Sequence, residues 1–158
     1  MGLKVGFTGT RRGMTQHQFG LCKELADVLI YGARAVPGKP EWHHGGQAGA
    51  DRESHVIAHA LGYVCHVHPC PGVSRLGYVA AGIDYPDDVW HEVFPPLTRD
   101  RIIAEEVGVL IAAPESDKEV QRSGSWATIR YAYAAGAPVI HLPRGTGVMV
   151  KPRAGRRS

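Results

Sequence analysis

The chain has 158 residues, a net charge of +3, a hydrophobic content of 44% and a charged content of 21%. These values are typical of one globular domain with a sizeable core, and no apolar run approaches the roughly 20 residues of a membrane-spanning helix. Three cysteines are too few, and odd in number, for a disulfide framework. No secretory signal is visible, so we expect a cytoplasmic protein without a membrane partner.

The positive charge is concentrated near the C-terminus. Five of the 18 basic residues follow Pro143, and without them the net charge of +3 becomes −2. A mildly acidic body argues against a nucleic-acid partner and leaves only weak, salt-sensitive binding through a basic tail. We therefore predict one domain over residues 1–143 and a flexible basic tail over residues 144–158.

The first half of the chain alternates strand and helix patterns. The apolar run Lys4–Thr8 predicts a buried strand, and apolar residues at helical spacing predict a helix that Thr15 caps and that ends near Tyr31. Residues 41–44 predict a second strand. A second helix is expected over residues 51–61, where Gly62 supplies a C-terminal cap.

The second half continues this alternation after an irregular segment. Residues 70–96 are rich in Gly, Pro and Asp and show no period, which predicts a long loop of the kind that often covers a site. A strand over 63–68 is expected before this segment. The elements expected after it are a helix capped by Thr98 through Val107, a strand over 108–113, a helix over 125–135 and a strand over 138–142.

This alternation predicts an α/β fold, a Rossmann-like three-layer sandwich with a mainly parallel sheet of about five or more strands. Ligands of such sheets bind outside the carboxyl ends of the strands. Three turns of small residues fall at that edge: Thr8–Thr10, His44–Asp51 and Ser123–Ser125. Glycine allows close approach of the backbone, and a helix start offers free N–H groups, so we predict one pocket for a phosphate-bearing, nucleotide-type ligand.

Several side chains near these turns are candidates for the pocket. Arg11 could clamp a phosphate, and Asp51 either caps its helix or hydrogen-bonds a ribose hydroxyl. Arg99 is a cation at a helix start, which the helix dipole disfavours. It either binds the ligand or pairs with Asp100 or Glu105.

The aromatic and helical neighbours of the turns leave further alternatives open. Ser125 could cap its helix and bind an anion, and Trp126 could either stack on a base or pack in the core. His55 lies one turn from Asp51 on the same helical face and could reach the pocket.

A cluster of possible metal ligands lies near two strand ends: His43, His44, Cys65, His66, His68 and Cys70. Zinc binds such side chains, and His66 and His68 share one face of a strand. Their spacing, however, matches no standard zinc pattern. We therefore predict no metal and no cofactor.

Five short motifs occur in an order that is typical of a known superfamily. They are Gly6-Phe7-Thr8-Gly9-Thr10-Arg11, His44-Gly45-Gly46-Gln47-Ala48-Gly49-Ala50-Asp51, Arg99-Asp100-Arg101-Ile102-Ile103, Leu110-Ile111-Ala112-Ala113-Pro114 and Ser123-Gly124-Ser125-Trp126. They resemble the SLOG superfamily, named after the DNA-processing Smf/DprA proteins and the LOG enzymes, and above all its small YspA/YpsA-like members. The resemblance spans residues 3–143 and implies a nucleotide-binding Rossmann-like domain, with a homodimer expected as in LOG relatives.

LOG enzymes hydrolyse the N-glycosidic bond of nucleoside 5′-monophosphates, using an Arg and a Glu. By resemblance Arg99 falls on the position of that Arg, whereas Thr128 stands where the family has its Glu. Two functions follow: a nucleotide sensor or sequestering protein, or an N-glycosidic hydrolase or transferase whose chemistry is carried by Asp51, Arg99 and Asp100. The predicted ligand-binding residues are Gly9, Thr10, Arg11, Gly45, Gly46, Gly49, Ala50, Asp51, Arg99, Pro114, Gly124, Ser125 and Thr128.

Overall fold

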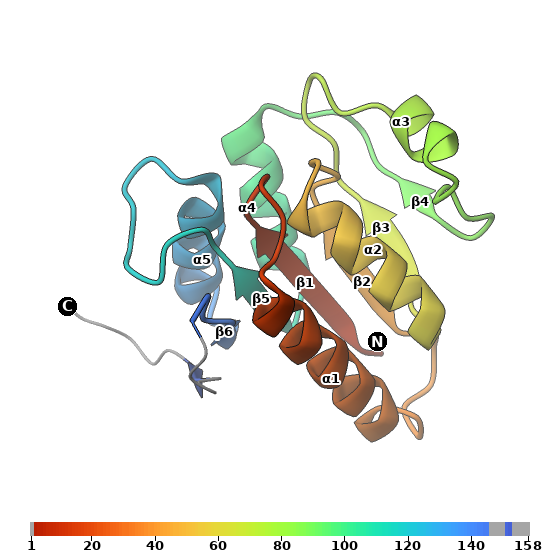
Figure 1. The fold of residues 1–158 in the computed structure, drawn as a ribbon. Coiled ribbons are helices and arrows are strands. Elements are labelled where there is room, and N and C mark those ends of the chain that lie inside the picture. The colour runs from red at the N-terminus through yellow and green to blue at the C-terminus, as the bar shows by residue number, and fades with distance from the viewer. Residues whose placement is uncertain (1, 146–150, 153–158) are drawn as a thin grey trace.

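Strands and helices alternate along the computed structural model, which describes residues 2–145 and the backbone of residues 151–152 (Figure 1). The strands are β1 (Lys4–Gly9), β2 (Glu41–His44), β3 (Val64–Val67), β4 (Val89–Trp90), β5 (Val109–Ala113), β6 (Val139–His141) and β7 (Lys151–Pro152). They form one sheet in the order β4-β3-β2-β1-β5-β6-β7, in which every neighbouring pair is parallel except β6 and β7. The expected α/β Rossmann-like sandwich is confirmed.

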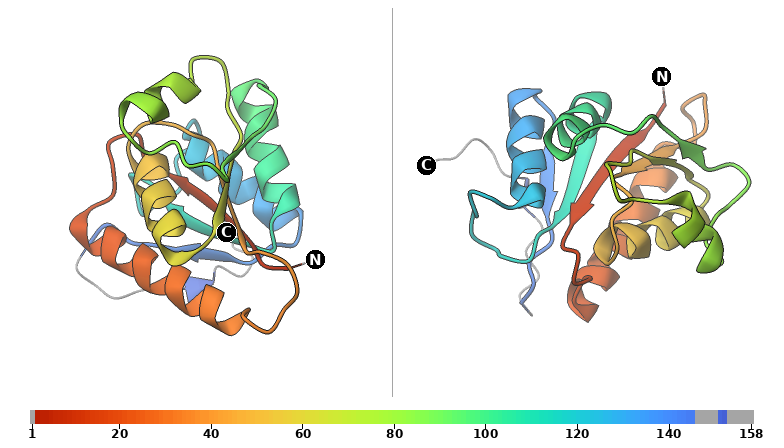
Figure 2. Two further views of the ribbon diagram at one scale, coloured as in Figure 1. Left: turned by 90° about the vertical axis from the view of Figure 1, so that its right-hand side faces the viewer. Right: turned by 90° about the horizontal axis from the view of Figure 1, so that it is seen from above.

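Helices cover both faces of this sheet. They are α1 (Gln16–Gly32), α2 (Ala50–Leu61), α3 (Arg75–Ala80), α4 (Pro96–Glu106) and α5 (Gly124–Ala134). Helices α1 and α2 pack together on one face and α4 and α5 on the other, whereas the short α3 lies beside β4 (Figures 1 and 2). Among the described residues, no helix is long and apolar enough to cross a membrane.

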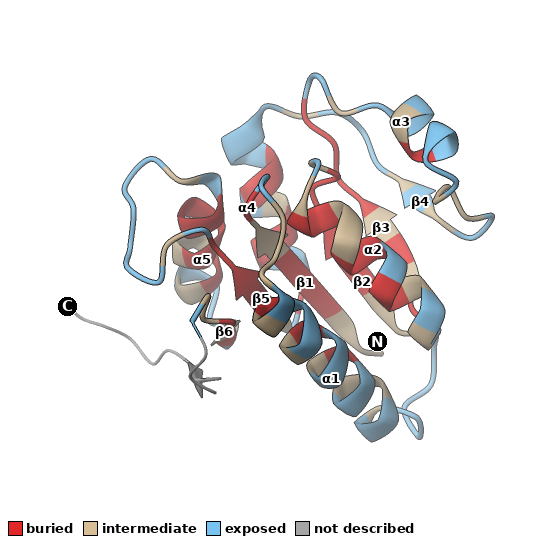
Figure 3. Ribbon diagram, viewed as in Figure 1, coloured by how far each residue is buried: buried red, intermediate tan, exposed pale blue. Residues whose placement is uncertain are grey.

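The central strands separate two apolar cores, and β5 shows how the sequence builds both. Ile111 of this strand packs in the core under α1 and α2 with Phe7 and Trp42. Leu110, its neighbour in sequence, packs in the core under α4 and α5 with Ile129. Buried residues accordingly follow the central strands and the inward faces of the helices (Figure 3). A strand that is buried on both faces reads as a continuous apolar run, which explains why this strand was recognisable in the sequence.

Two of the observed helix ends agree with those predicted from the sequence, and two differ from them. Thr15 caps α1 in a capping box with Gln18, and Gly62 ends α2 in the left-handed conformation, with φ of 104°. Helix α4 begins at Pro96 rather than after Thr98, because proline fits the first helical position. Ser123, not Ser125, caps α5 by accepting a hydrogen bond from the Trp126 N–H.

The 70–96 segment was predicted to be a loop, and it contains α3 and β4. Both elements are too short to give a periodic pattern: α3 has 6 residues and β4 has 2. Ser74 caps α3 by accepting a hydrogen bond from the Leu76 N–H, and β4 extends the sheet by pairing with β3. These elements therefore depend on a cap and on tertiary pairing rather than on hydrophobic periodicity.

The predicted tail is only partly within the described residues. The Arg144 N–H donates to Asp117 at 3.0 Å, and β7 pairs with β6. Residues 146–150 and 153–158 lie outside the described part of the chain. The domain boundary and the flexible tail therefore stay predictions.

Two glycines bring the first and second turns into direct contact at the carboxyl edge of the sheet. A Cβ atom on Gly9 would lie 2.5 Å from the Ala50 Cβ. A Cβ atom on Gly49, whose φ is +85°, would overlap the Arg11 carbonyl oxygen. The turns can touch only because both positions lack a side chain.

We expect Gly49→Ala to lower the free energy of unfolding by about 2–4 kcal/mol, because it adds a steric overlap to a positive φ. The matched control is Gly20→Ala in α1, where a Cβ atom has open space and alanine should stabilise by about 0.5–1 kcal/mol. Urea unfolding measures both. Equal stabilities of the two variants would contradict the contact between the turns.

Candidate functional site

A cavity of about 640 Å³ opens at the carboxyl edge of the sheet, between the turns that follow β1, β2 and β5. Its walls come from four segments that are distant in sequence, which is the arrangement expected for a ligand site in a parallel sheet. The predicted residues that line it are Gly9, Thr10, Arg11, Gly45, Asp51, Arg99, Asp100, Gly124, Ser125 and Thr128.

Four residues of the predicted site do not line this cavity, and three of them support its walls. Gly46 packs closely against the side chains behind the turn, and Ala50 fills the space that Gly9 leaves. Gly49 packs on the first turn. The Pro114 carbonyl accepts a hydrogen bond from Gln18 Nε2 at 3.4 Å.

The glycine turn after β2 uses its own N–H groups. The Gly46 N–H donates to His44 Nδ1 at 2.9 Å, and the Gln47 N–H donates to Asp51 Oδ2 at 3.1 Å. The Ala50 N–H donates to the Thr10 carbonyl at 3.0 Å. A carboxylate of the protein therefore occupies part of the space in which the sequence predicted an anionic ligand. This turn shapes the wall of the cavity and leaves these donors unavailable.

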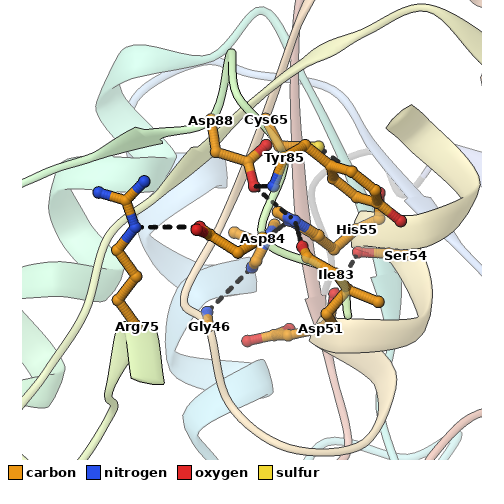
Figure 4. A network of polar contacts seen from close by, with 11 residues as sticks. Gly46, Asp51, Ser54, His55, Cys65, Arg75, Ile83, Asp84, Tyr85 and Asp88 are labelled. Carbon is orange, nitrogen blue, oxygen red and sulfur yellow. Dashed lines mark hydrogen bonds and ion pairs between the residues drawn. The ribbon is translucent and has the colours of Figure 1, made fainter. Parts of the chain in front are cut away.

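A chain of side-chain hydrogen bonds holds that turn from behind (Figure 4). His44 Nε2 lies 2.9 Å from His55 Nδ1, and His55 Nε2 lies 3.0 Å from Asp88 Oδ2 and 2.9 Å from the Ile83 carbonyl. His55 thus points into the 70–96 segment. The sequence had placed it one turn from the pocket, and it does not line the cavity.

The two ends of this chain fix the position of every proton in it. Because Gly46 donates to His44 Nδ1, the His44 proton is on Nε2 and is donated to His55. The His55 proton is then on Nε2, where it faces the Asp88 carboxylate. Burial, assisted by the neighbouring His55, lowers the pKa of His44 well below its ordinary value, so this ring is neutral.

Arg99 ties α4 to the glycine turn. Its Nη1 donates to the Gly45 carbonyl at 2.7 Å and to the His68 carbonyl at 3.0 Å, and its Nε donates to Asp100 Oδ1 at 2.7 Å. The side chain is 7% exposed. Of the alternatives that the sequence left open, the ion pair with Asp100 is present, whereas Glu105 pairs with Arg101.

Asp51 is the carboxylate most affected by its surroundings. It does not cap α2, whose N-cap residue is Gly49. Its Oδ1 atom is buried and has no hydrogen-bond partner among the described residues. Burial raises the pKa of Asp51 to about 7, against the opposing charge of Arg99. This group can therefore exchange a proton near neutral pH beside the cavity.

The start of α5 forms the opposite wall. Trp126 is buried and its Nε1 donates to the Ser116 carbonyl at 3.2 Å, so the ring packs at the wall. The Thr128 hydroxyl donates to the Gly124 carbonyl at 3.0 Å and lies beside Asp100. At Thr128 this wall thus presents a hydroxyl, with Asp100 as the neighbouring carboxylate.

Several residues of the wall lie outside the turns and side chains that the sequence predicted. They are Phe7, Arg12, Ile103, Glu115, Ser116, Val120 and Arg122. The signal that could have found four of them is the position of loop 114–122, because it follows β5 at the same edge. Within the described residues, the side chains of Arg11 and Arg122 make no hydrogen bond or ion pair, whereas Arg12 lies 3.5 Å from Glu115.

The predicted histidine and cysteine cluster is divided between the two faces of the sheet. His44 and Cys65 face α2, whereas His43, His66 and His68 lie on the opposite face. Cys70 instead accepts a hydrogen bond from Gln47 Nε2 near the turn. The division follows from the pleat, since neighbouring residues of a strand point to opposite faces.

Comparison with known proteins agrees with this architecture. No protein-family model and no curated protein sequence matches the chain. Among solved structures, DNA processing protein A (DprA) from Streptococcus pneumoniae matches 91% of this chain over 51% of its own, with a TM-score of 0.65 and 20% identity. The molybdenum cofactor carrier protein from Chlamydomonas reinhardtii matches 89% of this chain over 76% of its own length, with a TM-score of 0.60 and 19% identity.

A third neighbour is the molybdenum cofactor binding protein from the phototrophic bacterium Rippkaea orientalis. It matches 89% of this chain over 76% of its own, with a TM-score of 0.64 and 14% identity. The fold and its edge cavity define a Rossmann-like α/β domain. The fold is similar to that of DprA and of the two molybdenum cofactor proteins.

The raised pKa of Asp51 predicts a specific pH dependence of stability. Between about pH 4 and pH 7 the folded state keeps a proton that the unfolded state, with the ordinary pKa of 3.8, has released. Stability therefore falls as pH rises through this window. We expect the chain to lose about 2–4 kcal/mol relative to Asp51→Asn between these pH values.

Urea unfolding at a series of pH values measures this difference. The control is Asp87→Asn, which alters an exposed carboxylate of the 70–96 segment and should follow the unmodified chain. Parallel profiles for the unmodified chain and Asp51→Asn would mean that Asp51 has an ordinary pKa in the folded state.

Proposed function

We propose that this chain binds a nucleotide or a nucleotide-derived ligand in the edge cavity and acts as a sensor or sequestering protein. The observation that carries the proposal is the distribution of free and occupied polar groups around one cavity. Arg11 and Arg122 are available at its walls, and Asp51 offers a buried, unpartnered oxygen. The arginines suit the phosphate of a nucleotide, and the Asp51 carboxylate suits a hydroxyl of its sugar.

The phosphate is best placed at the start of α5. The N–H groups of Gly124 and Ser125 lie in the first turn of this helix, where no intrahelical acceptor exists. The positive end of the helix dipole and the adjacent Arg122 favour an anion there. The glycine turn after β2 is less suitable, since its donors already serve His44, Asp51 and Thr10.

The sugar and base then lie toward Asp51 and Arg99. A ribose hydroxyl could donate to the unpartnered Asp51 Oδ1, which would satisfy a group whose burial is otherwise costly. Two of the solved neighbours are named as binding or carrying the molybdenum cofactor. Their names support small-molecule binding by this fold and do not identify the ligand of this chain.

Removal of a free cation should weaken phosphate binding. We expect Arg122→Ala to weaken binding of a nucleoside 5′-monophosphate by about 1.5–3 kcal/mol, as for loss of a charged hydrogen bond. Binding of the nucleoside without its phosphate should change little. Isothermal titration calorimetry with adenosine monophosphate, guanosine monophosphate and the matching nucleosides measures both effects.

The control for this experiment is Arg101→Ala, which removes an exposed arginine of α4 that lies outside the cavity and pairs with Glu105. It should leave the affinity unchanged. An unchanged affinity in both Arg122→Ala and Arg11→Ala would overturn the placement of the phosphate. Binding of none of these nucleotides would overturn the nucleotide class.

A second candidate function, hydrolysis or transfer at the N-glycosidic bond, is favoured by one observation. Asp51 combines a pKa of about 7 with a position beside Arg99 and Asp100 in the cavity. A carboxylate there could stabilise positive charge that develops on the sugar. The wall has no Glu at Thr128, and Arg99 is already occupied by two carbonyls and Asp100. We therefore rank binding above hydrolysis.

Chromatography for free base separates these functions. We expect nucleoside monophosphates to bind without release of base on prolonged incubation with the chain. Release of base that is abolished in Asp51→Asn, a variant that should retain the fold, would overturn this ranking and assign Asp51 to the reaction. The homodimer and the cytoplasmic location stay predictions.

A further inference from the structure

A row of stacked histidine rings lies on the sheet face opposite α2, outside the cavity described above. His43 stacks on His66 with ring centroids 4.4 Å apart, and His68 stacks on His91 at 4.1 Å. Helices α4 and α5 pack over β1, β5 and β6, whereas these rings lie over β2 and β3. His66 is partly exposed, with a side-chain accessibility of 15%, so solvent reaches the row.

We propose that Glu41, His43 and His66 of this row bind a divalent transition-metal ion of the zinc type. Glu41 Oε1 lies 2.8 Å from His43 Nε2 and 3.6 Å from His66 Nε2, and all three atoms lie within 4.8 Å of one another. Two ligands of a tetrahedral zinc ion are separated by about 3.3 Å. Small side-chain adjustments therefore bring the three atoms to a shared ion.

The sheet itself holds these three residues in position. Glu41 and His43 are two residues apart in β2 and so share a face, and His66 is the parallel register partner of His43. Ligands on paired strands need little ordering before they bind. Two imidazoles and one carboxylate form a donor set that zinc and similar ions use, with the remaining position open to water.

The other nitrogen of each candidate histidine ligand is already hydrogen-bonded. His43 Nδ1 lies 2.8 Å from His68 Nε2, and His66 Nδ1 lies 2.9 Å from His91 Nε2. Histidines that bind metals nearly always have such a partner, which fixes the ring orientation and tautomer. On binding, His43 would carry its proton on Nδ1 and donate it to His68 Nε2, and His68 would in turn carry its own proton on Nδ1.

A second group with similar spacing, His55, Cys65 and Asp88, is better explained as structure. His55 uses one nitrogen toward His44 and the other toward Asp88 and Ile83. The Cys65 thiol donates to the His55 carbonyl, and burial raises the pKa of this thiol far above its ordinary value. This group is enclosed, and its histidine Nε2 faces a backbone carbonyl as well as the carboxylate, so these atoms already serve the fold.

The test is titration of the full chain, first treated with chelator, with Zn²⁺ in competition with a chromophoric chelator. We expect one equivalent to bind, and we expect Glu41→Gln and His66→Ala each to weaken binding by at least about tenfold. Circular dichroism checks that each variant is folded. Two variants from different strands keep the test valid if one of them fails to fold.

Two controls place the ion. Cys65→Ser and His59→Ala, both outside the row, should bind Zn²⁺ as the unmodified chain does. With Co²⁺ in place of Zn²⁺, visible absorption without a thiolate charge-transfer band is expected. Absence of a stoichiometric site, full retention of binding in both row variants, or its loss in Cys65→Ser would each overturn the proposal.

Discussion

The position of the glycine turn depends on one chain of hydrogen bonds, which runs from the Gly46 N–H through His44 and His55 to Asp88. Each imidazole accepts on one side and donates on the other, so both rings are satisfied while neutral and buried. The chain joins three segments that are far apart in sequence: the turn, α2 and the 70–96 segment. That segment therefore supports the cavity wall from outside through hydrogen bonds, whereas its composition had suggested a loop that covers the site.

The same turn explains the unusual state of Asp51. The N–H groups of the turn donate to His44, Asp51 and Thr10. The Asp51 carboxylate is therefore held through Oδ2, and its Oδ1 has no partner among the described residues. Arg99 is close enough to oppose the effect of burial but donates its own bonds to Gly45, His68 and Asp100. The charge of the site is thus balanced within the protein, with one oxygen and two peripheral arginines left for a ligand.

The sequence predicted the sandwich and the edge at which the cavity lies, because buried parallel strands and glycine turns leave clear local signals. It did not predict α3 and β4, whose stability comes from a cap and from pairing with β3. It also could not show that Gly46, Gly49 and Ala50 pack behind the wall and do not line the cavity. A glycine that allows close approach looks the same in sequence whether a ligand or another turn approaches it, as Arg11 approaches Gly49 here.

His43 and His44 are consecutive residues whose side chains lie in two different environments. One ring faces the stacked row and its neighbour faces α2, because consecutive residues of β2 point to opposite sides. Insertion or deletion of one residue within this strand would exchange the two rings and disrupt both networks at once. Over evolutionary time, β2 is therefore expected to tolerate substitutions far better than changes in length, whereas the Pro- and Gly-containing connection before it is free to lengthen.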